Sequence, residues 1–106
     1  MKRFFMLSAM IGLFFGTIAV SAAPASANHP IIKEIVGYMM SRPTKMEEKI
    51  ADAVDRFKVE NGRPSYKEAN KNLGKTLSDF ARFSSAPAGV SQRQYFTNTV
   101  IIYLQY

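Results

Sequence analysis

The chain has 106 residues and a formal net charge of +6, and it contains one histidine, no cysteine and no tryptophan. This length suits a single small domain, and the missing cysteine excludes disulfides, thiol nucleophiles and thiolate metal sites. The single histidine leaves no base for a serine or threonine nucleophile, and a zinc site would need carboxylates as its remaining ligands. We therefore expect a protein that is not an enzyme and that needs no metal or cofactor.

Residues 1–27 have the composition of a secretory signal peptide. Lys2 and Arg3 are their only charges, an uncharged stretch follows over residues 4–20, and small residues with one proline fill positions 21–27. A basic end, an apolar helix and a stretch of small residues are the three parts of such a signal. The chain is therefore predicted to be exported, to the periplasm or the extracellular medium.

The cleavage site follows from the small residues. Ala25 and Ala27 form an A-x-A motif, which predicts cleavage before Asn28 and a mature domain of residues 28–106. The alternative is an uncleaved anchor, because residues 4–23 are long enough to cross a bilayer.

The mature domain would be small for a protein without disulfides. A chain of this size buries only about 60–65% of its unfolded surface, so hydrophobic gain and chain entropy nearly cancel. We expect such a domain to depend on local helix stability, on self-association or on a partner that completes its core. This expectation motivates the hypothesis of a small interaction protein.

The first helix is predicted over residues 31–41. Pro30 opens it, and the Ser41-Arg42-Pro43 stretch ends it. The apolar residues recur with the i, i+1, i+4, i+5 spacing of one helical face. They are Ile31, Ile32, Ile35, Val36, Met39 and Met40.

The second helix is predicted over residues 45–61. Thr44 and Glu47 have the spacing of a capping box at its start, and Gly62 and Pro64 are typical of its end. Its apolar face comprises Met46, Ile50, Ala53, Val54 and Phe57.

The third helix is predicted over residues 66–83, with a second capping box formed by Ser65 and Glu68. Glycine within a helix costs about 1 kcal/mol relative to alanine. The sequence therefore leaves open whether the helix breaks at Gly74, in which case a short further helix would begin at Thr76. The apolar face comprises Tyr66, Ala69, Leu73, Leu77 and Phe80, with Phe83 as an open sixth member.

Residues 61–74 resemble the start of the helix-turn-helix of LexA-type winged-helix repressors. In that family a Gly-x-Pro turn leads into a short helix ending in Leu-Gly, as Gly62-Arg63-Pro64 and Leu73-Gly74 do here. The pattern departs from the family at Asn70, where a small residue is usual. The resemblance implies a second helix from residue 76 to 83 that contacts DNA. An exported protein meets no chromosome, so we do not expect nucleic acid as its partner.

The last segment, residues 95–106, follows a loop at 84–89 and is rich in Thr, Val, Ile and Tyr. This composition favours a strand, because Thr97-Asn98-Thr99 are poor helix formers. A lone strand needs a hairpin, a second copy or another protein to satisfy its backbone. A helix capped at Ser91 is the alternative.

Two groups of possible ligands have simpler explanations. Glu47, Glu48, Asp52 and Asp55 lack the glycine-containing loop of a calcium site, and Asp52 has the i, i+4 spacing for an ion pair with Arg56. We therefore expect a solvated acidic face.

A copper site at the mature N-terminus would use His29 with Met39, Met40 and Met46 as soft ligands. The methionines lie on predicted apolar faces, and His29 would lie at a frayed terminus. No metal is therefore expected.

The predicted fold is mainly α, with three helices and a C-terminal β segment or hairpin, and a four-helix bundle is the alternative. The predicted function is a small exported interaction protein, an inhibitor, adaptor or accessory subunit, whose partner is another protein or a second copy. Its predicted contact residues are Tyr95, Phe96, Ile101, Tyr103 and Tyr106.

Two alternative functions remain. The first is a cationic protein that binds anionic membranes or wall polymers, although its basic residues are scattered and interleaved with acids. The second is the helix-turn-helix-like DNA-binding module.

Overall fold

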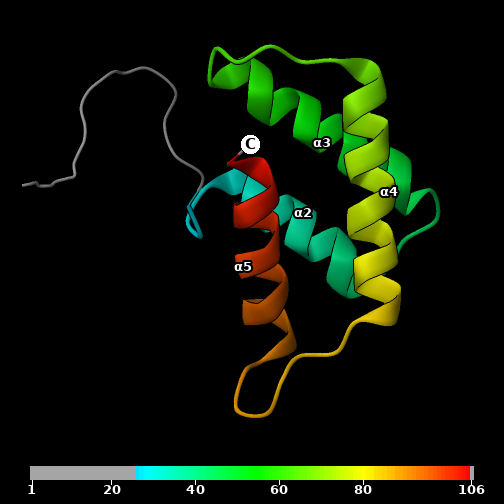
Figure 1. Cartoon of the computed structure of the whole chain (residues 1–106), viewed down its shortest axis with the longest axis vertical. Coiled ribbons are helices and arrows are strands. Elements are labelled where there is room, and N and C mark those ends of the chain that lie inside the picture. Colours follow the sequence, from blue (N-terminus) through cyan, green and yellow to red (C-terminus); the bar gives the residue numbers. More distant parts are fainter. Residues whose placement is uncertain (1–25, 106) are drawn as a thin grey trace, which may run out of the picture.

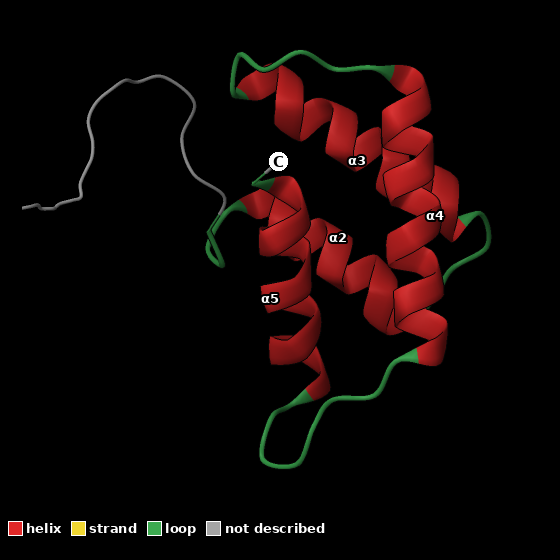
Figure 2. Cartoon of the chain, viewed as in Figure 1, coloured by secondary structure: helices red, strands yellow, loops and turns green. Residues whose placement is uncertain are grey.

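The computed structural model of the chain describes residues 26–105 (Figure 1). This part contains four α-helices, namely α2 (Pro30–Ser41), α3 (Met46–Glu60), α4 (Lys67–Phe83) and α5 (Gln92–Leu104). Loops connect the helices, and none of the residues in this range forms a strand (Figure 2). Residues 1–25, with most of the predicted signal peptide, and Tyr106 lie outside the described part.

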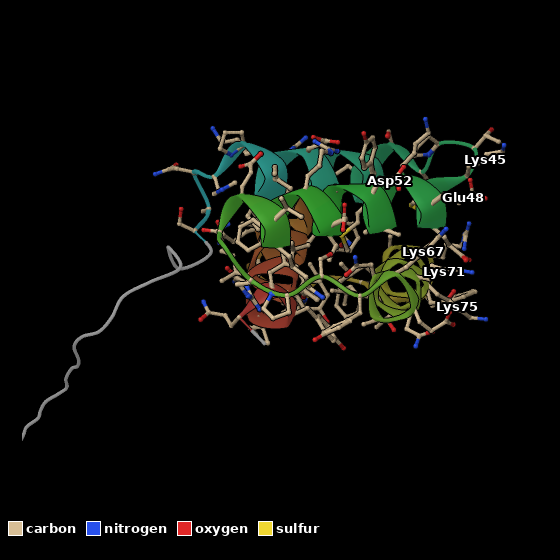
Figure 3. The ribbon with its side chains drawn as sticks, turned by 90° about the horizontal axis from the view of Figure 1, so that it is seen from above. Lys45, Glu48, Asp52, Lys67, Lys71 and Lys75 are labelled. Carbon is tan, nitrogen blue, oxygen red and sulfur yellow. The ribbon has the colours of Figure 1, made fainter. Side chains whose placement is uncertain are left out.

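The helices form two antiparallel pairs that pack as two layers. α2 and α3 run in opposite directions in one layer, and α4 and α5 do so in the other (Figures 1 and 3). α3 packs most extensively on α4, while α2 contacts both α3 and α5. Contact between α4 and α5 is much smaller, and it includes the rings of Phe80 and Tyr95, whose centroids are 5.1 Å apart.

The core lies between the layers and confirms the apolar faces predicted for the first two helices. Met40 is the exception, because it is partly exposed at the end of α2. α4 contributes Leu77 and Ala81, and α5 contributes Phe96, Val100 and Leu104. The buried residues of α2 and α3 are Ile31, Ile32, Ile35, Val36, Met39, Met46, Ile50, Ala53, Val54 and Phe57.

The prediction of a C-terminal β segment or hairpin is wrong, because residues 92–104 are helical. The four-helix alternative fits. The Ser91 hydroxyl caps α5 by accepting a hydrogen bond from the Gln94 amide at 3.1 Å. Phe96, Val100 and Leu104 then recur every four residues, which places all three in the core.

The threonines that favoured a strand are accommodated within the helix. Thr97 donates its hydroxyl to the Arg93 carbonyl oxygen at 2.8 Å, and Thr99 donates to the Tyr95 carbonyl oxygen at 2.9 Å. Each hydroxyl is thereby satisfied one turn back along the same helix. Tertiary packing therefore outweighs the low intrinsic helix propensity of this segment.

Both predicted capping boxes are also wrong. Lys45 and Tyr66 occupy the N-cap positions of α3 and α4, and neither side chain accepts a capping hydrogen bond. The end of α3 follows the prediction, since Gly62 adopts a left-handed φ of 66°. The amides of Gly62 and Arg63 donate to the carbonyls of Val59 and Lys58, at 3.1 and 2.9 Å, which is a Schellman motif.

α4 passes through Gly74 without a break, so the single helix predicted over residues 66–83 forms and the interruption left open at Gly74 does not. The helix-turn-helix resemblance needs a turn between residues 74 and 76, and this turn is absent.

No helix among residues 26–105 is both long and apolar enough to span a membrane.

Candidate functional site

α3 and α4 approach each other closely at Gly74. A Cβ atom built on this glycine would lie 2.5 Å from the Glu47 carbonyl oxygen and 3.2 Å from the Ala51 Cβ. Because only glycine fits between the two backbones, this crossing fixes the distance between the side chains on either side of it. A groove of about 560 Å³ lies beside the crossing.

A buried polar network forms the floor of this groove. Asn70 is only 3% exposed. Its Oδ1 accepts from Lys58 Nζ at 2.9 Å, and its Nδ2 donates to Ser65 Oγ at 2.9 Å. Ser65 in turn donates to Asp55 Oδ1. Ser65 therefore joins this network instead of capping α4, and the network ties the 61–66 loop to both helices.

Burial affects the one cation in this network. Desolvation lowers the pKa of the Lys58 ammonium, and the nearby positive charge of Arg63 lowers it further. The hydrogen bond to Asn70 is the polar partner that such a half-buried ammonium requires.

The two walls of the groove carry opposite charges. α3 supplies Glu48, Asp52 and Asp55, and α4 supplies Lys67 and Lys71. Lys75 lies one turn further along α4, and we call Lys67, Lys71 and Lys75 the lysine row and Glu48 and Asp52 the acidic row. Figure 3 shows Glu48 on α3 above Lys71 and Lys75 on α4. Among the described residues no ion pair within 4 Å joins the two rows.

The acidic face is solvated, as the sequence predicts, because Glu48 and Asp52 are exposed. The predicted pair of Asp52 with Arg56 is replaced by a different one. Arg56 instead binds Glu34 of α2 through both of its terminal nitrogens. In residues 26–105 no three His, Cys, Asp or Glu side chains gather closely enough to hold a metal ion.

His29 has a structural position instead of a frayed one. Its Nδ1 accepts from the Ile31 amide at 3.1 Å and so caps α2, and its ring packs edge-on against Phe57 at 4.9 Å. Met39 and Met46 are buried in the core, so they do not face His29 across a surface site.

The predicted contact residues on α5 do not form one surface. Phe96 is buried in the core, whereas Tyr95 and Ile101 are partly buried against it. Tyr103 is 40% exposed, and Tyr106 lies outside the described part. The prediction missed Ile102, which is 57% exposed. Helical spacing could have found it, since positions 95, 99 and 102 share one helical face.

The predicted cleavage site is accessible in its described portion. Ala27 and Asn28 are exposed in a turn ahead of α2, and Ala25 lies outside the described residues.

No protein-family model, no curated protein and no solved structure matches the chain. No function is therefore inherited from a relative.

Proposed function

We propose that the chain is exported, is cleaved before Asn28, and acts as a small non-enzymatic protein that binds another exported or envelope protein. The observation that carries this proposal is the outer side of α5. Ile102 and Tyr103 are exposed there, while Phe96, Val100 and Leu104 on the inner side already fill the core.

Single exposed apolar residues are normal on protein surfaces. Here, however, two lie side by side, and Tyr95 on the same helix is only partly covered. Aromatic side chains of this kind provide large contact area at interfaces. Tyr95 and Ile102, spaced by i and i+7, together with Tyr103 give α5 an apolar strip of the kind that fits an apolar groove on a partner protein.

The binding test uses the full chain expressed in an exporting bacterium. A photocrosslinking residue placed at position 102 is expected to capture a discrete protein species. The same residue at Phe83, which is 81% exposed at the end of α4, is the matched control and is expected to capture none. The double variant Ile102→Glu with Tyr103→Ser should prevent binding. Equal crosslinking from positions 102 and 83 would contradict the proposal.

Export has its own test. N-terminal sequencing of the product recovered outside the cytosol should begin at Asn28. Recovery of the intact chain from the cytosol, with Met1 in place, would contradict export.

Binding to an anionic surface is the second candidate, and the lysine row of α4 favours it. Lys67, Lys71 and Lys75 are all exposed on one side of the helix. The adjacent acidic row repels the same anionic surface, which places this function second. Co-sedimentation with phosphatidylglycerol vesicles tests it, because such binding should fall steeply with added salt.

The DNA-binding alternative relied on a turn at Gly74, where α4 is continuous, so we do not propose it.

A further inference from the structure

We propose that the face formed by α3 and α4 associates with a second copy of this chain. In this dimer the acidic row of one copy, Glu48 and Asp52, faces the lysine row of the other, Lys67, Lys71 and Lys75. This surface is separate from the outer side of α5, so the dimer and the binding of another protein through α5 can be tested independently.

The charges of this face are available for a partner. All five side chains are exposed, and in the described part of the chain none of them takes part in an ion pair within 4 Å. The lysines repeat every four residues along α4, and the acids do so along α3, so each row presents its charges on one side of its helix. The Gly74 crossing holds the rows beside each other.

Symmetry makes such a face complementary to itself. In a twofold dimer the same patch of each copy meets the other. A twofold axis running along the groove places each acidic row opposite the partner's lysine row. An axis running across the groove would place like charges together, so the charges select the first arrangement.

A second copy also fits better than an anionic polymer. A nucleic acid or a lipid surface would satisfy the lysines but would be repelled by Glu48 and Asp52. Only a partner carrying both charges satisfies both rows, and every copy of this chain carries them in the required arrangement. Association would also stabilise a domain whose core is small.

Exposed ion pairs contribute little individually and are screened by salt. We therefore expect a weak, reversible dimer whose dissociation constant rises by at least about tenfold from roughly 50 mM to roughly 500 mM salt. Sedimentation velocity of the purified exported product over a range of concentrations measures this equilibrium.

Charge reversal provides the decisive test. One variant combines Lys67→Glu, Lys71→Glu and Lys75→Glu, and the other combines Glu48→Lys and Asp52→Lys. Asp55 is left unchanged because it binds Ser65 and Asn70. Each variant alone should be monomeric at low salt, because both of its rows then carry the same sign. An equimolar mixture should recover the dimer, because opposite rows again face each other.

The matched control reverses three exposed cations elsewhere, Lys33→Glu, Lys49→Glu and Arg93→Glu. It changes the net charge as much as the lysine-row variant does, and it should still dimerise. Circular dichroism checks that each variant folds, and the single reversals Lys71→Glu and Asp52→Lys replace any that does not. A monomeric unaltered chain at low salt, a mixture that stays monomeric, or a control that loses the dimer would each overturn the proposal.

Discussion

Gly74 shows how a single residue sets the spacing of two helices. In a helix interior glycine is less favourable than alanine by about 1 kcal/mol, so the sequence leaves a break there open. The structure instead uses the missing side chain to bring α4 against the Glu47 carbonyl and Ala51 of α3. A local pattern cannot reveal this contact, because the neighbour lies more than twenty positions earlier in the sequence.

We predict that Gly74→Ala destabilises the protein despite the higher helix propensity of alanine. The added methyl group would meet backbone 2.5 Å away, so one helix must move, and overpacking of this kind costs about 1–3 kcal/mol. Gly37→Ala on α2 is the control, because no atom lies within 4 Å of its built Cβ. This control should stabilise by about 0.5–1 kcal/mol. Urea unfolding measures both, and equal effects would contradict the role assigned to Gly74.

At the scale of elements, apolar spacing predicted α2, α3 and the extent of α4 to within about one residue at each end. α2 and α3 have one clear apolar face, so their period is visible in the sequence. The face predicted for α4 is only partly buried, since Leu77 lies in the core but Tyr66 and Phe83 are exposed. α5 has apolar residues on all sides, and its strand-favouring composition therefore dominated the prediction. What makes it helical is the cap at Ser91 and the packing of Phe96, Val100 and Leu104 against the rest of the core.

The starts of α5 and α3 differ in capping, because the Ser91 side chain caps α5 and no side chain caps α3. Ser91→Ala should cost about 1 kcal/mol, because the hydroxyl accepts from the Gln94 amide at the start of α5. Thr44→Ala should change stability by less than about 0.5 kcal/mol, because Lys45 occupies the N-cap position and Thr44 is exposed. Thermal unfolding of the two variants compares them. A larger effect at Thr44 would mean that the predicted capping box does form.

The pairing of α2 with α3 should make stability depend on pH. The hydrogen bond from Arg56 lowers the pKa of Glu34 below its ordinary value of 4.5, although burial opposes this effect. A depressed folded-state pKa adds stability above the unfolded value, and this stability is lost as the pH falls through the folded value. Because both partners are partly exposed, the loss should be at most about 1 kcal/mol.

Chemical unfolding between about pH 6 and about pH 3 checks this dependence. Glu34→Gln should flatten it, because the amide does not titrate. Glu68→Gln, an exposed glutamate on α4, is the control and should leave it unchanged. An unaltered slope in Glu34→Gln would exclude the pair as its source.

At the scale of the whole molecule, the candidate surfaces depend on how distant segments meet. The i, i+4 spacing of Lys67, Lys71 and Lys75 is visible in the sequence, but the sequence alone does not distinguish these lysines from the other, scattered basic residues. Their position beside Glu48 and Asp52 follows only from the α3–α4 crossing. Likewise, Phe96 and Tyr103 are both apolar residues of one segment, and only the packing of α5 separates the buried one from the exposed one.

α5 closes the core over the first helix pair, and we expect the whole fold to depend on it. Leu104 is fully buried one turn after Val100, and its carbonyl oxygen accepts from Arg63 Nη1 at 2.5 Å. Leu104→Ala should therefore cost about 2–5 kcal/mol, a large share of the roughly 5–15 kcal/mol that stabilises a typical domain.

Ile102→Ala, two positions earlier on the exposed side of α5, is the matched control and should cost less than about 0.5 kcal/mol. Urea unfolding followed by circular dichroism distinguishes the two variants, and Leu104→Ala should lose its whole helical signal in one transition at a lower urea concentration. A separate early transition that removes only part of the helical signal would show that α2, α3 and α4 hold together without α5. In that case the last helix would be an appended arm, and its buried residues would contribute only local stability.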